Sequence, residues 1–169
     1  SMPRAALLIG GPSKRFQFTQ ADHQNHISAA NDLLSKGYSL LITTSRRTPD
    51  WVQKDYSDLA KGNDKIWLHT GEGENPYFAF LGRAEIILVT EESTNMLTEA
   101  AATGKAVFTL PLSGDAGKFK QLHEALTDKC HLRPYRGDPT APDYPPLDET
   151  ARLAEKLWAH YDRRDAVLN

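Results

Sequence analysis

The most chemically informative stretch of the sequence places hydroxyl and amide side chains at the start of a predicted helix and a carboxylate inside it. Ser93, Thr94 and Asn95 follow an apolar strand, and Glu99 lies in the next helix. Unpaired backbone N–H groups and the helix dipole make such a helix start favourable for an anion. Glu99 would lie about 8–9 Å further along the helix axis. That offset suits a ligand with a phosphate at one end and vicinal hydroxyls at the other.

A second candidate turn is rich in glycine. Gly10, Gly11 and Ser13 follow the first predicted strand. The two glycines allow positive φ and a close approach of the backbone, and Ser13 offers a hydroxyl. Neither the P-loop pattern GxxxxGK[ST] nor the dinucleotide pattern GxGxxG is present. Taken alone, each of these features has an ordinary explanation: a plain turn, a helix N-cap, or a surface glutamate that interacts with the helix dipole.

The elements that must position these residues alternate along the chain. Apolar, β-branched runs predict strands over residues 5–9, 38–43, 65–69, 85–90, 106–110 and 129–133. Helices are predicted over residues 22–35, 48–61, 75–81, 96–103 and 116–127, and after Leu147, where Leu153, Leu157, Trp158 and Tyr161 are amphipathically spaced. Thr48 and Asn75 are each followed by proline and are predicted as N-caps.

This alternation predicts the α/β class with a doubly wound, parallel, Rossmann-like sheet. In the common strand order 3-2-1-4-5-6 the switch point lies between strands 1 and 4. The turns at residues 10–13 and 91–95 follow those two strands, so we expect them to be neighbours at one sheet edge. Residues 43–47, which include Thr44, Ser45, Arg46 and Arg47, leave the second strand at the same edge. This segment either adds positive charge to the crevice or is a solvated loop.

Composition bounds the remaining possibilities. The chain has 169 residues, with 20 Lys and Arg against 22 Asp and Glu, which suits one domain over residues 3–169 and gives no basic field for nucleic acid. Residues 1–2 resemble an expression scar. We expect no transmembrane segment and no signal peptide. Cys130 is the single cysteine, predicted as a small buried residue in a reducing compartment. His23 and His26 are predicted as surface polar residues and not as metal ligands.

Several motifs in order resemble a known family. S-T-N-M-x-x-E-A-x-x-x-G-K-x-V, from Ser93 to Val107, resembles the donor-binding signature of GT-B glycosyltransferases such as the peptidoglycan N-acetylglucosaminyltransferase. The closer resemblance is to the mitochondrial fission elongated-mitochondria family and its bacterial homologues, often labelled nucleoside-diphosphate-sugar epimerases. It rests also on L-I-G-G-P-S, T-T-S-R-R-T-P, G-E-N-P-Y, G-K-F and Y-P-P-L-D-E-T. These motifs span nearly the whole chain.

The resemblance implies the C-terminal domain of a GT-B fold that binds a nucleotide sugar, such as a UDP-linked donor, with no further cofactor and no metal. Its implied diphosphate-binding residues are Gly10, Gly11, Ser13, Ser93, Thr94 and Asn95, and its ribose-binding residue is Glu99. The implied surroundings of the base and sugar are Thr44, Ser45, Arg46, His69, Thr70, Asn75, Tyr77 and Met96. Two carboxylates beside a diphosphate are costly, so this role requires Glu91 and Glu92 to point away.

The resemblance also implies an N-terminal domain outside this sequence, and a bacterial protein that is cytoplasmic or peripheral to a membrane. No Ser–His–Asp, paired-carboxylate or metal arrangement is evident in the sequence, so we expect the domain alone to be inactive. The alternative is an interaction module, like the plant fission factor, that recruits a partner and catalyses nothing. A dinucleotide-dependent epimerase is disfavoured, because GxGxxG and Tyr-x-x-x-Lys are both absent.

Overall fold

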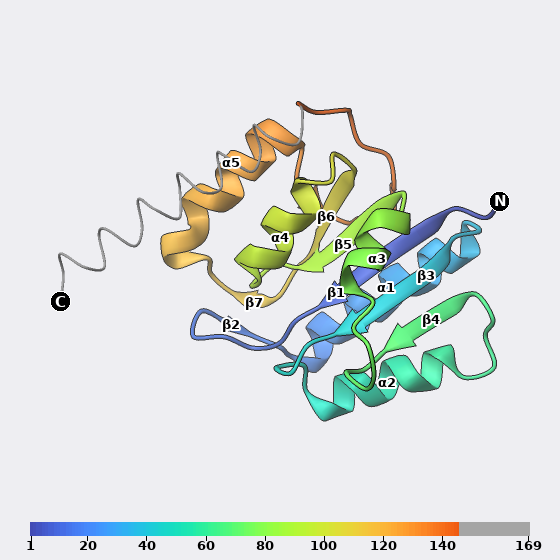
Figure 1. Cartoon of the computed structure of the whole chain (residues 1–169). Helices are drawn as coiled ribbons and strands as arrows, with labels where there is room; N and C mark the ends of the chain where they lie inside the picture. The colour runs from blue at the N-terminus through green and yellow to red at the C-terminus, as the bar shows by residue number, and fades with distance from the viewer. Residues whose placement is uncertain (146–169) are drawn as a thin grey trace.

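The computed structural model describes residues 1–145 and is shown in Figure 1. The strands are β1 (Arg4–Ile9), β2 (Phe16–Gln17), β3 (Ser39–Thr44), β4 (Ile66–His69), β5 (Ile86–Thr90), β6 (Ala106–Leu110), β7 (Ser113–Gly114) and β8 (Arg133–Pro134). The helices are α1 (Gln20–Ser35), α2 (Asp50–Ala60), α3 (Tyr77–Arg83), α4 (Thr94–Ala101) and α5 (Lys120–Cys130), with a short 3₁₀ helix η1 (Gly117–Phe119). The helix predicted after Leu147 lies outside the described residues.

Six strands form one parallel sheet in the order β4-β3-β1-β5-β6-β8. The central strand is β1, in which Leu7 lies opposite Ile42 of β3 and Leu88 of β5. This is the predicted doubly wound order, and it reverses between β1 and β5. The carboxyl ends of these two strands lead into residues 10–13 and 91–95, so the predicted convergence of the two turns is confirmed.

Each face of the sheet has its own apolar core. Successive side chains of a strand point to opposite faces. Accordingly Ala5, Leu7 and Ile9 of β1 pack with residues of α1 and α2, whereas Ala6 and Leu8 pack with residues of α3, α4 and α5. Figure 1 shows α3 and α4 on the face turned to the viewer and α1 on the opposite face. The continuous apolar runs of the sequence are therefore explained by burial on both faces.

Each of the five described α-helices starts at a different residue than the sequence predicted, and the starts of α2 and α4 bear on the site. Thr48 is not the N-cap of α2, which begins at Asp50 after Pro49. The Thr48 hydroxyl instead lies 2.7 Å from the carbonyl oxygen of Gly10, to which it donates. Its local capping preference is overridden by a contact with the first turn, which brings the loop after β3 to the site.

The start of α4 lies two residues earlier than the predicted helix. The helix runs from Thr94 to Ala101, and Ser93 is its N-cap, with Oγ accepting from the Met96 amide at 3.3 Å. The residues assigned to a polar turn are therefore the cap and first turn of the helix itself. This places the side chains of the turn directly at the positive end of the helix dipole.

His23 and His26 are buried, and their prediction as surface residues was wrong. They are only 2% and 0% exposed, because α1 packs this face against α2 and the sheet. His23 Nε2 lies 3.1 Å from Asp55 Oδ2, and His26 Nε2 donates to the Pro111 carbonyl at 2.7 Å. Burial lowers the pKa of both imidazoles, that of His26 to about 4. Within residues 1–145, no cluster of three His, Cys, Asp or Glu side chains could hold a metal ion.

The end of the described chain also departs from the prediction. The strand expected over residues 129–133 is instead the end of α5, which His131 closes in the left-handed conformation at φ 57°. The strand β8 is limited to Arg133–Pro134. Cys130 is 1% exposed, which confirms its prediction as a buried residue. A second, antiparallel pair of short strands, β2 and β7, was not predicted, and it brings Phe16 opposite Gly114.

Candidate functional site

The two predicted turns are joined by hydrogen bonds at the carboxyl edge of the sheet. The Gly10 amide donates to Thr90 Oγ1 at 2.8 Å, and the Gly11 amide donates to Glu92 Oε1 at 3.0 Å. Neither glycine has positive φ among the described residues, so that part of their predicted role is wrong. Their close backbone approach is present instead: a Cβ on Gly10 would lie 1.7 Å from Glu92 Oε1. The close packing of the two turns therefore requires residues without side chains at positions 10 and 11.

Glu92 is the centre of this contact. Its side chain is 0% exposed, and Oε1 also lies 3.4 Å from Arg47 Nη2. The second oxygen, Oε2, has no hydrogen-bond partner among the described residues. Burial raises the pKa of Glu92, against the lowering effects of hydrogen bonds from Thr90 and Gly11 and of the Arg47 charge. The predicted phosphate role required both Glu91 and Glu92 to point away from the glycine turn. Glu92 does not, because it accepts from the Gly11 amide, whereas Glu91 does and accepts from the Leu112 amide at 2.7 Å.

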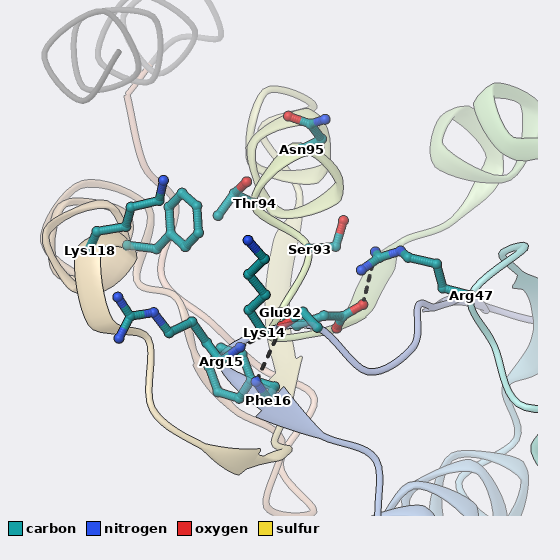
Figure 2. Close-up of a pocket in the computed structure, with 11 residues that line it drawn as sticks. Lys14, Arg15, Phe16, Arg47, Glu92, Ser93, Thr94, Asn95 and Lys118 are labelled. Carbon is teal, nitrogen blue, oxygen red and sulfur yellow. Dashed lines mark hydrogen bonds and ion pairs between the residues drawn. The ribbon is translucent and has the colours of Figure 1, made fainter. Parts of the chain in front are cut away.

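A cavity of about 580 Å³ opens beside the start of α4. Figure 2 shows its basic side chains, with Arg15 and Lys118 on one side of the view and Arg47 on the other. The cavity is lined by Ser13, Lys14, Arg15, Phe16, Arg47, Glu92, Ser93, Thr94, Asn95, Lys118 and Phe119. Four of its lining residues are cations and one is a carboxylate, so the cavity suits an anion.

The helix start adds backbone donors to this cavity. Thr94 and Asn95 are the first residues of α4, so their amides have no carbonyl four residues earlier in the helix to bind. The Ser93 hydroxyl already accepts from the Met96 amide as the N-cap of the helix. Four of the predicted diphosphate residues, Ser13, Ser93, Thr94 and Asn95, thus line one cavity. Gly10 and Gly11 do not line it, and their amides are bound to Thr90 and Glu92.

A second cavity, of about 600 Å³, lies at the same sheet edge. It is lined by Ile9, Thr43, Thr44, Ser45, Arg46, Gln53, His69, Thr70, Gly71, Gly73, Asn75, Tyr77, Phe78, Met96 and Glu99. All eight residues predicted near the base and sugar are among them, and so is Glu99. Consecutive residues line the two cavities, Arg46 and Arg47 in one loop and Asn95 and Met96 in one helix turn. The cavities therefore flank the same loop and the same helix start.

Glu99 is not an isolated surface carboxylate. Tyr77 Oη donates a hydrogen bond to Glu99 Oε2, which joins the first residue of α3 to the second turn of α4. Asn75 Oδ1 accepts from the Tyr77 amide at 3.0 Å and fixes the start of α3. Burial raises the pKa of Tyr77, and the hydrogen bond and charge of Glu99 add to this effect, so the phenol stays protonated.

Sequence reasoning indicated that the loop after β3 could add charge, but it named none of the four cations that line the first cavity as a site residue. Arg47 belongs to the loop after β3, and Lys118 belongs to η1, which follows β7. The available signals were the two cations after Ser13 and the G-K-F motif that contains Lys118. These signals were weak, because an exposed cation is usually only solvated.

Comparisons with known proteins were made against families, sequences and solved structures. The family model described as "Mitochondrial fission ELM1" matches residues 1–161. The "Mitochondrial fission protein ELM1" of Arabidopsis thaliana is 25% identical over 92% of this chain and 37% of its own length. "Uncharacterized protein RP120" of Rickettsia prowazekii is 30% identical over 89% of this chain and 44% of its own length.

Solved structures share the fold. The UDP-GlcNAc 2-epimerase of Methanocaldococcus jannaschii, in complex with UDP-GlcNAc and UDP, matches 92% of this chain and 39% of its own with a TM-score of 0.57 at 14% identity. The UDP-GlcNAc 2-epimerase of Neisseria meningitidis, bound to UDP-GlcNAc, matches 99% of this chain and 39% of its own chain, with a TM-score of 0.50 at 13% identity. These GT-B-like neighbours establish the Rossmann-like fold class. The chain spans less than half the length of each of these relatives.

The contact between the turns predicts a specific sensitivity to alanine. A Cβ on Gly11 would lie 2.0 Å from the backbone carbonyl oxygen of Arg47, an atom that cannot rotate away. We expect Gly11→Ala to reduce the free energy of unfolding by about 1–3 kcal/mol in urea denaturation. The control is Gly82→Ala in α3, where a Cβ meets nothing within 4 Å. That variant should gain about 0.5–1 kcal/mol from helix propensity. Equal effects of the two variants would contradict the close approach.

Glu92 predicts a pH dependence of stability. Its pKa in the folded protein lies above the ordinary value, so the folded state binds this proton more tightly than the unfolded chain does. The contribution of Glu92 to the free energy of unfolding therefore falls as pH rises from the ordinary pKa of a glutamate to the raised pKa in the folded protein. We expect the free energy of unfolding of the wild type, minus that of Glu92→Gln, to increase from about pH 7 to about pH 5. Urea denaturation series measure this difference, with the exposed Glu124→Gln as a control for loss of a carboxylate; a decrease would show that the burial of Glu92 is misassigned.

Proposed function

The chain belongs to the mitochondrial fission ELM1 family, and from this premise we propose that its carboxyl sheet edge binds a nucleoside diphosphate, free or as part of a nucleotide sugar. The observation that carries the proposal is the division of chemistry between the two cavities. Four cations, one carboxylate and a helix start line the first, whereas the second is lined by one carboxylate, one arginine and mainly uncharged polar and aromatic groups. A nucleoside diphosphate has the same division.

The phosphate end would bind in the first cavity. The amides of Thr94 and Asn95 point from the positive end of α4, where an anion is favoured. Ser13 adds a hydroxyl, and Arg47 adds a guanidinium that can pair with two phosphate oxygens. Because Glu92 already occupies the Gly11 amide, side chains and the helix start would supply the recognition of phosphate in place of the glycine turn.

The nucleoside end would bind in the second cavity. Glu99 lies six residues beyond Ser93, which corresponds to about 9 Å along the helix axis. Its carboxylate would accept a ribose hydroxyl there, and His69, Thr70 and Phe78 would surround the base. UDP is the first ligand to test, because the solved epimerases with this fold are complexes with UDP-GlcNAc. Sugar transfer from such a donor is the reaction class that this arrangement would serve, with the anion cavity stabilising the leaving diphosphate.

A second candidate function is a recruitment module, which the name of the Arabidopsis relative and one surface feature favour. Phe78 is 73% exposed on α3, beside the second cavity. A large exposed aromatic side chain is suited to a protein contact. None of the helices within residues 1–145 combines the length and apolar character needed to cross a bilayer. Nucleotide binding distinguishes the two functions.

The test is calorimetric titration of the protein with UDP, ADP, GDP and CDP. We expect at least one of them to bind with a dissociation constant below about 1 mM. Glu99→Gln keeps an oxygen that can accept from Tyr77 but removes the charge. Because charge-assisted hydrogen bonds contribute about 1.5–3 kcal/mol against roughly 1 kcal/mol for neutral ones, we expect about tenfold weaker binding.

The matched control is Glu124→Gln, which removes an exposed carboxylate on α5 that lines neither cavity. Its affinity should equal that of the wild type. Absence of binding by all four nucleotides at millimolar concentration, or equal affinities of Glu99→Gln and the wild type, would overturn the nucleotide proposal and leave the recruitment module.

A further inference from the structure

The hydrogen bond between Tyr77 and Glu99 connects two helices at the second cavity, and it changes what that cavity can recognise. Both side chains line the cavity, Tyr77 from the start of α3 and Glu99 from the middle of α4. Tyr77 donates its only hydroxyl proton to Glu99 Oε2. The phenol oxygen keeps its acceptor capacity, and Glu99 Oε1 has no hydrogen-bond partner among the described residues. Two acceptors of different chemistry therefore lie side by side.

We propose that Tyr77 and Glu99 together recognise a vicinal diol, with Glu99 Oε1 accepting one hydroxyl and Tyr77 Oη accepting the other. This inference rests on the proposed nucleotide site and assigns Tyr77 as a second specificity-determining residue for the ribose. A carboxylate that binds a diol alone uses both of its oxygens. Here one oxygen already accepts from Tyr77, and on this proposal the phenol oxygen accepts the second hydroxyl in its place.

The pair also fixes the carboxylate before the ligand arrives. A glutamate side chain on a helix surface samples several rotamers, and fixing them on binding costs free energy. The hydrogen bond from Tyr77 holds the Glu99 carboxylate in the cavity in the empty protein. Asn75 holds Tyr77 in turn by accepting from its amide at 3.0 Å. The phenol remains a donor to Glu99 at ordinary pH, because burial raises its pKa.

The chain contains a second pair of the same chemistry that provides a matched control. Tyr135 Oη donates to Asp32 Oδ2 at 2.5 Å, and neither residue lines either of the two cavities. Replacing either tyrosine with phenylalanine removes one phenol–carboxylate hydrogen bond and little else. A purely structural role would therefore give similar results at the two positions.

The experiment titrates wild type, Tyr77→Phe and Tyr135→Phe with the ribonucleoside diphosphate that binds most tightly among UDP, ADP, GDP and CDP, and with its 2′-deoxy and 3′-deoxy forms. We expect Tyr77→Phe to bind the ribonucleotide about three- to tenfold more weakly, the loss of one hydrogen bond. With one of the two deoxy forms the loss should be clearly smaller, because the hydroxyl that would donate to Tyr77 is already absent and only the positioning of Glu99 is lost. Tyr135→Phe should bind all three ligands as the wild type does.

The outcomes separate this inference from the proposed function. If the wild type binds the ribonucleotide but Tyr77→Phe binds it equally well, the diol role of Tyr77 is overturned and the nucleotide site stands. The same conclusion follows if Tyr77→Phe loses the same factor with all three ligands, because its effect would then not depend on either hydroxyl. If the wild type binds none of the four ribonucleotides, the proposed function fails and this inference fails with it.

Discussion

The packing of the Glu92 carboxylate against the glycine turn determines the shape of the whole carboxyl edge. The turn can approach only because Gly10 and Gly11 have no side chains, since a Cβ on either would lie within 2.0 Å of Glu92 or Arg47. Burying a carboxylate with one oxygen unpaired is costly. The Gly11 amide and the Arg47 guanidinium offset part of that cost. The same contacts hold three loops together, after β1, β3 and β5.

This contact also changes how an anion would be recognised. In a phosphate-binding loop, backbone amides are aligned before the ligand arrives and require little reorganisation. In this chain the Gly11 amide is satisfied internally by a carboxylate. In the proposed complex, recognition of phosphate would instead depend on the start of α4 and on long cationic side chains such as Lys14 and Arg15. Such side chains lose rotamer freedom on binding, and salt screens their charges where they are exposed. Affinity at this edge should therefore depend more on ionic strength than affinity in an amide-lined loop.

The alternation of strands and helices could be predicted from the sequence because it depends on local patterns, and the location of the candidate site followed once the common strand order of this fold class was assumed. Apolar runs separated by helices determine a parallel sheet, and a parallel sheet with this order has one switch point. The direction of individual side chains could not be predicted in the same way. Glu92 turns toward Gly11, which lies 81 residues away in the chain, and Thr48 leaves its capping position for Gly10. His26 is buried because Pro111 supplies a carbonyl acceptor from a distant loop. Each of these depends on a contact that becomes visible only after the chain has folded.

The helix α4 gives the two cavities a fixed relation. Its first turn lines one cavity and its middle lines the other, so the spacing between the proposed anion and diol subsites follows from helix geometry. The Tyr77 hydrogen bond ties the middle of this helix to α3, and the cap at Ser93 fixes its start. In the proposed complex a ligand must therefore match the site in length as well as in charge. A free diphosphate would fill only the first cavity and a nucleoside only the second. A nucleoside diphosphate would span both, so on this proposal the geometry of one short helix would select it over either of its parts.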